Sequence, residues 1–175
     1  YDILSGLVGS EMFIRDRCLT QFRCISNNTE KQLTYVPETT TWADTIPFVH
    51  PVNGGICIKV YDGDTITIAA KLPYKGSPIY RFSVRLNGID TPEIKGKTKD
   101  EKQCAVLARD TLKELILGKK VELRNVQNEK YGRILAEVYC DEINLNAWMI
   151  TQRFAVKYDG GTKMSPISWM AYHKG

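Results

Sequence analysis

Four short stretches of the sequence contain the polar residues best suited to chemistry: Asp62-Gly63-Asp64-Thr65, Arg85, Asp90-Thr91-Pro92-Glu93 and Lys130-Tyr131-Gly132-Arg133. Their carboxylates stand beside glycine or proline, in positions typical of strand ends and loops, where binding and catalytic groups are often found. Paired carboxylates can hold a hard cation, and arginines can bind phosphate oxygens with two parallel hydrogen bonds. Taken singly, each stretch also fits an ordinary structural role, as a hairpin turn, a helix N-cap or a solvated strand face.

The elements that must position these residues follow from the hydrophobic pattern. Apolar alternation and turn signals predict five strands, over residues 56–61, 65–70, 80–86, 120–126 and 133–139. Thr98 and Glu101 have capping-box spacing, and apolar residues recur at helical spacing up to Ile116. This pattern predicts a helix that stops at Gly118. A second helix is expected over residues 143–151, and a third in the tail after Pro166.

Three strands, a helix, two strands and a helix can be arranged as a barrel with an inserted helix. We therefore predict an α+β fold of the OB type, a five-stranded Greek-key barrel with an inserted helix and C-terminal helices. The open face and loops of such barrels commonly bind oligonucleotides or oligosaccharides. Fold alone does not determine which.

The composition is that of a globular chain of 175 residues, for which one domain is the usual expectation. No apolar run reaches the roughly 18–20 residues of a membrane helix, so no membrane partner is expected. Residues 55–175 carry 20 basic and 14 acidic side chains, a net charge of +6 that suits a polyanion. His50 and His173 are the only histidines, which disfavours nucleases that use a histidine base or clustered histidine ligands. Nothing in the sequence requires more than a monomer.

The five cysteines are odd in number, widely spaced and without a C-x-x-C pair: Cys18, Cys24, Cys57, Cys104 and Cys140. A disulfide framework or a zinc site is therefore not expected. Reduced, mostly buried thiols and the lack of a visible signal peptide favour an intracellular compartment.

The N-terminal part is expected to stand apart from the domain. Residues 7–17 resemble the conceptual translation of a transposon sequencing adapter, so we expect residues 1–17 not to be native. The alternative is a genuine N-terminal strand or helix, and any signal peptide would have been lost with the native N-terminus. Residues 18–54 are polar and rich in threonine, as in a linker or an extended arm. The domain is expected over residues 55–175.

In their order and spacing, the four stretches resemble the staphylococcal nuclease (thermonuclease) family, from about Gly55 to Gly161. The resemblance implies an OB-fold phosphodiesterase that uses calcium to cleave DNA and RNA. By motif, Asp64 and Asp90 correspond to the carboxylate ligands of the calcium ion, and the backbone carbonyl of Thr91 to a third ligand. Asp62 corresponds to an acid that lies nearby without binding the ion.

The resemblance also implies roles for the remaining residues. Glu93 corresponds to the residue usually assigned as general base toward the attacking water, and Arg85 and Arg133 correspond to two phosphate-binding arginines. Lys130 corresponds to a lysine that contacts phosphate, and Tyr131 to a tyrosine near the nucleotide. Tyr158 stands in a segment that is aromatic in the family, where a core role is an open alternative. If bases stack on Tyr131 and Tyr158 as on other OB barrels, single strands are preferred.

Two features depart from the family pattern. The loop over residues 94–99 is shorter than in the best-known secreted members, so substrate preference and exo or endo action stay open. The C-terminal helix is short or absent beyond Trp169. Two other functions are considered: a catalytically inactive nuclease-like domain that binds nucleic acid or a protein, and an OB module for oligosaccharides or proteins. The first is disfavoured because every expected catalytic acid and arginine is present, and the second by the charge of +6 and the ordered motifs.

Overall fold

The computed structural model describes residues 36–175. The segment expected to be non-native, residues 1–17, and residues 18–35 of the expected arm lie outside the described part. The chain divides into two compact units, of which the first ends at Ile46 and the second spans Pro47–Gly175. The described part of the first unit contains one short 3-10 helix, η1 (Trp42–Asp44), which begins after Thr41.

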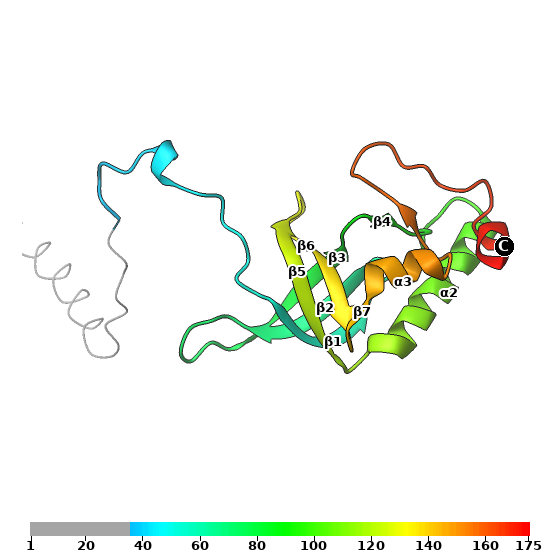
Figure 1. The fold of residues 1–175 in the computed structure, drawn as a ribbon, viewed down its shortest axis with the longest axis horizontal. Coiled ribbons are helices and arrows are strands. Elements are labelled where there is room, and N and C mark those ends of the chain that lie inside the picture. The colour runs from blue at the N-terminus through cyan, green and yellow to red at the C-terminus, as the bar shows by residue number, and fades with distance from the viewer. Residues whose placement is uncertain (1–35) are drawn as a thin grey trace, which may run out of the picture. The chain divides into compact units, whose positions relative to one another are not determined.

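A closed barrel of five strands forms the centre of the second unit (Figure 1). The strands are β1 (Gly54–Val60), β2 (Thr65–Lys71), β3 (Ile79–Leu86), β5 (Lys120–Asn128) and β6 (Ile134–Cys140). Neighbours are antiparallel in the order β3-β2-β1-β5-β6, and β6 then pairs in parallel with β3. That last pairing closes the sheet and confirms the predicted fold class.

The barrel core follows from the strand alternation in the sequence. In β6 every second residue, from Ile134 to Cys140, is buried, and the residues between are partly exposed. Ile66 and Ile68 on β2 and Val84 and Leu86 on β3 are fully buried against them. Burying one such aliphatic side chain stabilises the fold by about 1.5–3 kcal/mol.

Helix α2 (Lys99–Ile116) covers the core with its apolar face, which includes Ala108, Leu112 and Ile116. The Thr98 side chain accepts a hydrogen bond from the Glu101 backbone N–H at 3.1 Å, as the capping box predicts. The Glu101 carboxylate does not return to Thr98 but accepts from the Lys97 N–H at 3.0 Å. A side chain at Gly96 would overlap this carboxylate, so glycine lets the loop fold over it.

The C-terminal third differs in detail from the prediction. Residues Ile143–Asn144 form a short strand, β7, that pairs with the end of β6, so the helix α3 begins two residues later than expected and spans Leu145–Thr151. Helix α4 (Trp169–Lys174) is short, begins after Ser168 and packs against α2. Within residues 36–175, no helix is long and apolar enough to cross a membrane.

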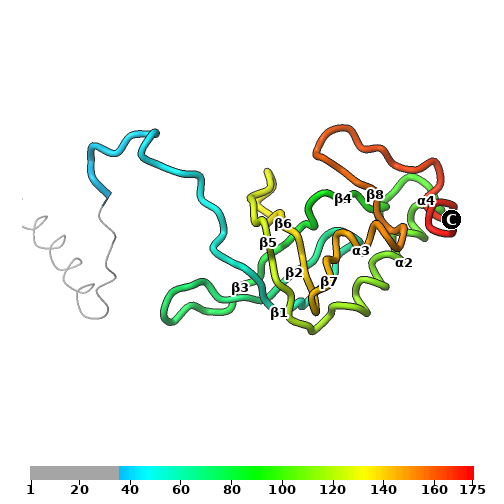
Figure 2. Tube along the Cα trace, viewed as in Figure 1, coloured from blue at the N-terminus to red at the C-terminus, as the bar shows by residue number. Residues whose placement is uncertain are grey.

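A two-stranded ladder was not anticipated. Strands β4 (Ile89–Asp90) and β8 (Val156–Lys157) pair antiparallel, with Asp90 opposite Val156. Figure 2 shows them side by side next to the barrel. This ladder brings the chain after α3 alongside Asp90, and it decides which residues reach the site.

Candidate functional site

The β1–β2 turn carries the first acidic motif. Asp62 accepts a hydrogen bond from the Asp64 N–H at 3.3 Å, and the Thr65 hydroxyl donates to Asp64 Oδ1 at 2.8 Å. A Cβ at Gly63 would lie 3.1 Å from the Thr91 side chain. Glycine at this position therefore allows the turn to pack closely against the second acidic motif, which begins at Asp90.

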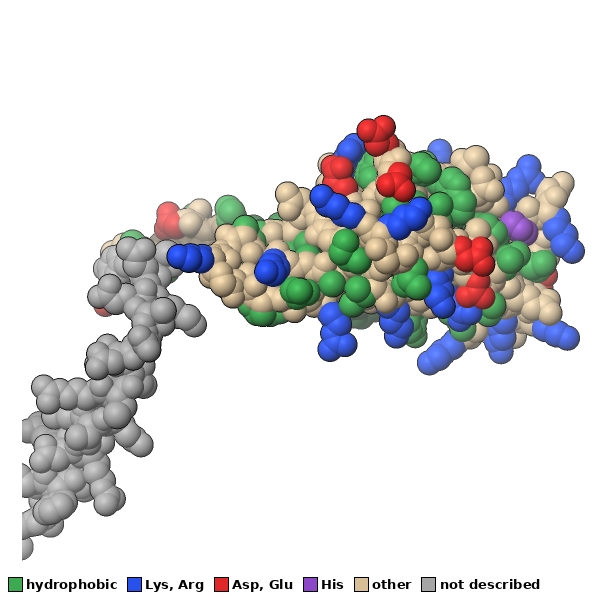
Figure 3. Space-filling view, turned by 90° about the horizontal axis from the view of Figure 1, so that it is seen from below, with side chains coloured by type: hydrophobic (Ala, Val, Ile, Leu, Met, Phe, Trp, Pro, Cys, Tyr) green, Lys and Arg blue, Asp and Glu red, His purple; other side chains and the backbone are tan. Residues whose placement is uncertain are grey.

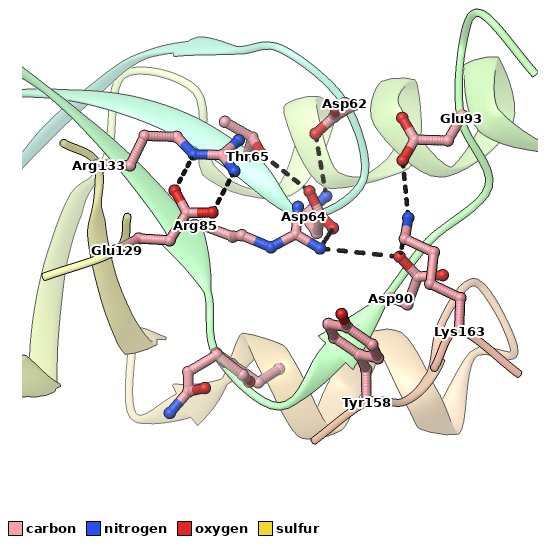
Figure 4. Close-up of polar contacts among 12 residues, drawn as sticks. Asp62, Asp64, Thr65, Arg85, Asp90, Glu93, Glu129, Arg133, Tyr158 and Lys163 are labelled. Carbon is pink, nitrogen blue, oxygen red and sulfur yellow. Dashed lines mark hydrogen bonds and ion pairs between the residues drawn. The ribbon is translucent and has the colours of Figure 1, made fainter. Parts of the chain in front are cut away.

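Asp64 and Asp90 are both buried, with 3% and 2% of their surface exposed, and they converge on Arg85 (Figure 4). Arg85 stands on β3 opposite Thr65 of β2, which puts its side chain next to the acidic turn. Its Nη2 lies 2.7 Å from Asp64 Oδ2 and 3.7 Å from Asp90 Oδ1. The guanidinium thus bridges carboxylates from two separate motifs.

The Asp64 carboxyl is electrostatically unusual. Burial, together with the nearby carboxylate of Asp62, raises the pKa of Asp64 to about 7, although Arg85 opposes the shift. Removal from water disfavours the charged form of a carboxyl group, and a second negative charge adds to that effect. A cation close to Asp64 would therefore favour its charged form.

Asp90 Oδ1 is buried, and its two neighbours are positively charged: Arg85 Nη2 at 3.7 Å and the Lys163 ammonium, whose Nζ lies 2.8 Å away. The same Nζ lies 3.0 Å from Glu93 Oε1. Burial lowers the pKa of Lys163, but the contacts with Asp90 and Glu93 outweigh it and raise the pKa overall. Lys163 was not anticipated: its sequence signal is only the Asp159-Gly160-Gly161 turn before it, which does not indicate what the lysine contacts.

Glu93 is placed at the rim of the site. About half of its side chain is exposed, and its carboxylate contacts Lys163. The Glu93 backbone N–H donates to Glu101 Oε1 at 3.4 Å, so the cap of α2 also holds the loop that carries Glu93. Glu93 therefore faces solvent on one side and the Asp90 carboxylate, through Lys163, on the other.

The β5–β6 turn supplies Arg133, Lys130 and Tyr131. The Arg133 guanidinium donates two hydrogen bonds to the Glu129 carboxylate, from Nε at 2.6 Å and from Nη2 at 2.7 Å. Figure 4 shows this pair on the same side of the barrel as Arg85 and Thr65. The Glu129 hydrogen bonds raise the pKa of Arg133, so its charge is secure. Tyr131 is 73% exposed, and the Lys130 Nζ lies 5.0 Å from the centre of its ring.

Tyr158 lies beside Asp90 and borders a cavity of about 730 Å³ (Figure 4). The Tyr158 N–H donates to the Gly88 carbonyl at 3.0 Å, next to the β4–β8 ladder. Asn87, Asn144 and Asn146 also line this cavity. Tyr158 is half-buried, at the border between the core and the cavity.

Asn146 is a positioning residue that sequence reasoning missed. It is 6% exposed, its Oδ1 accepts from the Val138 N–H at 2.9 Å, and its Nδ2 donates to the Asn87 carbonyl at 2.7 Å. These bonds tie α3 to β6 and to the turn before β4. An asparagine in a helix gives no signal of such a role before the fold is known.

The donor set at the centre of the site fits a hard cation. Within residues 36–175, no three His, Cys, Asp or Glu side chains converge as a protein-only metal cage. Asp64, Asp90 and the Thr91 carbonyl would supply two carboxylates and one backbone oxygen. The observation that favours a cation here is that two buried carboxylates, Asp64 and Asp90, lie close enough to share one positively charged neighbour, Arg85.

Parts of the chain are similar to proteins named as nucleases. Residues 83–166 match the family described as staphylococcal nuclease homologue. The chain is 33% identical over 106 residues to a protein of Escherichia coli named an uncharacterized endonuclease, which covers 60% of this chain. It is 35% identical over 101 residues to a protein of the same description from Haemophilus influenzae, and 27% identical over 78 residues to a probable staphylococcal-like nuclease of rice.

The matched segments cover part of these relatives. They amount to 61% of the Escherichia coli protein, 50% of the Haemophilus influenzae protein and 22% of the rice protein. The family match begins within β3, after the acidic turn at Asp62 and Asp64. In the structure, Asp64 contacts the matched segment through Arg85 on β3.

Proposed function

We propose that this chain, whose residues 83–166 match the family of staphylococcal nuclease homologues, hydrolyses phosphodiester bonds of DNA or RNA at the Asp64–Arg85–Asp90 site. The observation that carries the proposal is the convergence of two buried carboxylates from separate motifs on one strand-borne arginine. An arginine that faces two acids can change partners when a cation and a phosphate arrive. A solvated arginine on an outer strand face would have no such arrangement.

Calcium is the cofactor that the donor set and the family support. Asp64, Asp90 and the Thr91 carbonyl would hold it, because calcium prefers oxygen ligands and tolerates irregular geometry. When bound there, it would polarise a phosphate oxygen and lower the pKa of nearby water.

The chain's own groups would then bind and orient the phosphodiester. Arg85, at the centre, and Arg133, on the neighbouring turn, donate hydrogen bonds to the phosphoryl oxygens as negative charge increases there. For this, Arg133 must exchange part of its contact with Glu129 for phosphate. Glu93 accepts a proton from the attacking water at its carboxylate, which is exposed enough to reach it. Asp62 supports the Asp64 turn.

The surroundings suit a nucleic-acid strand. Tyr131 is exposed next to Lys130, and Tyr158 borders the cavity beside Asp90, so both can contact bases of an unpaired strand. The chain after Glu93 leads into a groove lined by basic side chains of β1, the loop and α2, which are Lys59, Lys95, Arg109 and Lys113. Figure 3 shows lysine and arginine side chains along one edge of the domain. Such a surface attracts a polyanion.

The test is hydrolysis of labelled single-stranded DNA and RNA by the full chain, with calcium and with EGTA. Glu93→Gln is the active-site variant, because Glu93 is exposed and its loss spares the core. Glu114→Gln, an exposed position on α2, is the matched control. Calcium-dependent cleavage by the wild type should fall by about 10²–10⁴ in Glu93→Gln and stay unchanged in Glu114→Gln.

Two results would contradict the proposal. Equal rates for the two variants would remove Glu93 from the reaction. A folded wild type that retards the oligonucleotides without cleaving them in calcium would favour the alternative function, a catalytically inactive domain that binds nucleic acid.

A further inference from the structure

A lysine ammonium group is paired with one of the candidate metal ligands. The Lys163 Nζ lies 2.8 Å from Asp90 Oδ1 and 3.0 Å from Glu93 Oε1, and it joins a candidate metal ligand to the candidate base. Asp90 is 2% exposed, so a lysine reaching it must turn inward, whereas 45% of the Lys163 side chain is still exposed. This is not the usual environment of a surface lysine, which points into solvent.

The chain on both sides of Lys163 is shaped to present it. Before it, the Tyr158 hydroxyl donates to the Gly161 carbonyl at 3.2 Å and the Gly161 N–H donates to Asp159 Oδ1 at 3.0 Å. These bonds form a turn at Gly160, whose φ of +93° favours glycine. After it, the Ser168 hydroxyl donates to Asp100 Oδ1 at 3.2 Å on α2. Lys163 is thus carried by a short segment fastened at both ends.

The Lys163 ammonium and a divalent cation are both positively charged, so both are attracted to the Asp90 carboxylate. A buried carboxylate such as Asp90 needs a compensating positive charge, and Lys163 provides one. A cation ligated by Asp90 would lie within a few ångströms of the ammonium, where like charges repel strongly. The Lys163 ammonium and the cation therefore cannot both keep their full interaction with the Asp90 carboxylate.

We propose that Lys163 is an internal counterion that competes with calcium for Asp90 and that calcium must displace it to occupy the site. On displacement, the ammonium keeps Glu93 or solvent as its partner while its contact with Asp90 is broken. The inference rests on the proposed calcium ligation by Asp90. It does not depend on catalysis, because the exchange occurs before substrate binds.

The direct test is calcium titration of the full chain by calorimetry, without substrate. Lys163→Ala should bind calcium at least about tenfold more tightly than the wild type, because the competing charge is gone. Lys163→Arg keeps a competing cation and should stay near the wild type. Lys75→Ala, an exposed position in the β2–β3 loop, removes the same charge elsewhere and should also stay near the wild type. Calcium affinity that is unchanged or weakened in Lys163→Ala would overturn the proposal.

A second measurement uses the wild type, so it does not depend on folding of a variant. Lysines are acetylated briefly with an amine-reactive ester, in calcium or in EGTA, and are quantified by peptide mass spectrometry. Lys163 should react several-fold faster in calcium, whereas Lys75 should react equally in both. Equal reactivity of Lys163 in the two conditions would overturn the proposal. Neither experiment measures cleavage, so a chain that exchanges Lys163 for calcium yet fails to cleave would refute the proposed function alone.

Discussion

Replacing Arg85 by alanine would remove the cation that joins two buried carboxylates. Arg85 Nη2 lies 2.7 Å from Asp64 and 3.7 Å from Asp90, and the side chain is 15% exposed. At an effective dielectric constant of about 20, charges at these separations attract by roughly 6 and 4 kcal/mol. The cost of burying the guanidinium offsets much of this attraction, and breaking a buried pair typically costs about 3–5 kcal/mol.

We therefore expect Arg85→Ala to lower the free energy of unfolding by about 3–5 kcal/mol in EGTA. Urea denaturation near pH 8 is the assay, because Asp64, with a pKa of about 7, is then mostly charged. Calcium should reduce the difference in free energy of unfolding between Arg85→Ala and the wild type. A ligand that binds only the folded state, present at a concentration of about a hundred times its Kd, adds about 2.7 kcal/mol of stability. The variant should gain more from calcium than the wild type, because no guanidinium competes for the carboxylates.

Turnover in saturating calcium separates this structural role from a role in phosphate binding. Arg85→Ala should cleave about 10²–10³-fold more slowly even where it is fully folded. Arg85→Lys keeps the charge but loses the planar pair of donors, so it should recover stability more than turnover. Arg81→Ala, an exposed arginine on the same strand, is the control for both assays. An Arg85→Ala variant as stable in EGTA as Arg81→Ala would refute the argument that Arg85 compensates the buried acids.

Two further predictions concern the frame of the site. Asn146→Ala should lower the free energy of unfolding, measured by urea denaturation, by about 2–4 kcal/mol, because it leaves the buried Val138 N–H and the Asn87 carbonyl without partners. The control variant Gln127→Ala, at an exposed position, should change this free energy little. Equal free energies of unfolding for the two variants would show that the Asn146 hydrogen bonds are dispensable. Burial raises the pKa of the Cys57 and Cys104 thiols to about 11, so the thiol form is favoured in the folded state. The contribution of these buried thiols to the free energy of unfolding should be complete below about pH 8.5 and be lost as the pH rises toward 11. Iodoacetamide near pH 8, followed by peptide mass spectrometry, should detect modification of the two cysteines only after unfolding. Rapid alkylation of the native chain would contradict their burial.

The barrel could be predicted because apolar and polar residues alternate regularly along its strands, and this alternation is visible in a single sequence. Strand β6 buries every second residue, and the observed strand, Ile134–Cys140, lies one residue from the expected range. Helix α2 was recognisable for the same reason, since Ala108, Leu112 and Ile116 recur at helical spacing before Gly118. Long periodic segments of this kind carry their own signal, whereas element boundaries depend on partners. The start of α3 illustrates this, because Asn144 pairs with Tyr139 before it caps the helix.

The site could be predicted only as far as its motifs. Asp64, Arg85, Asp90 and Glu93 were recognisable by type and spacing, and the structure brings them to one place, although their roles stay predictions. The ladder that fixes Asp90 has two residues in each strand, too few for any periodic pattern. Lys163 lies 70 residues beyond Glu93 and reaches it only through that ladder and the turn at Gly160. The sequence around Lys163 does not indicate that this lysine contacts Asp90 and Glu93.

The two cations at Asp90 differ in a way that assigns them different tasks. Arg85 stands on a central barrel strand, is 15% exposed and contacts both carboxylates, so its removal is costly and its position is set by the barrel. Lys163 stands on a segment outside the barrel, is 45% exposed and contacts one buried acid and one exposed acid. An arriving cation can displace the lysine into solvent at little cost, because its stem already lies at the surface. Displacing Arg85 would leave a buried guanidinium without partners. The fixed arginine should therefore remain to bind phosphate while the lysine is exchanged for the metal.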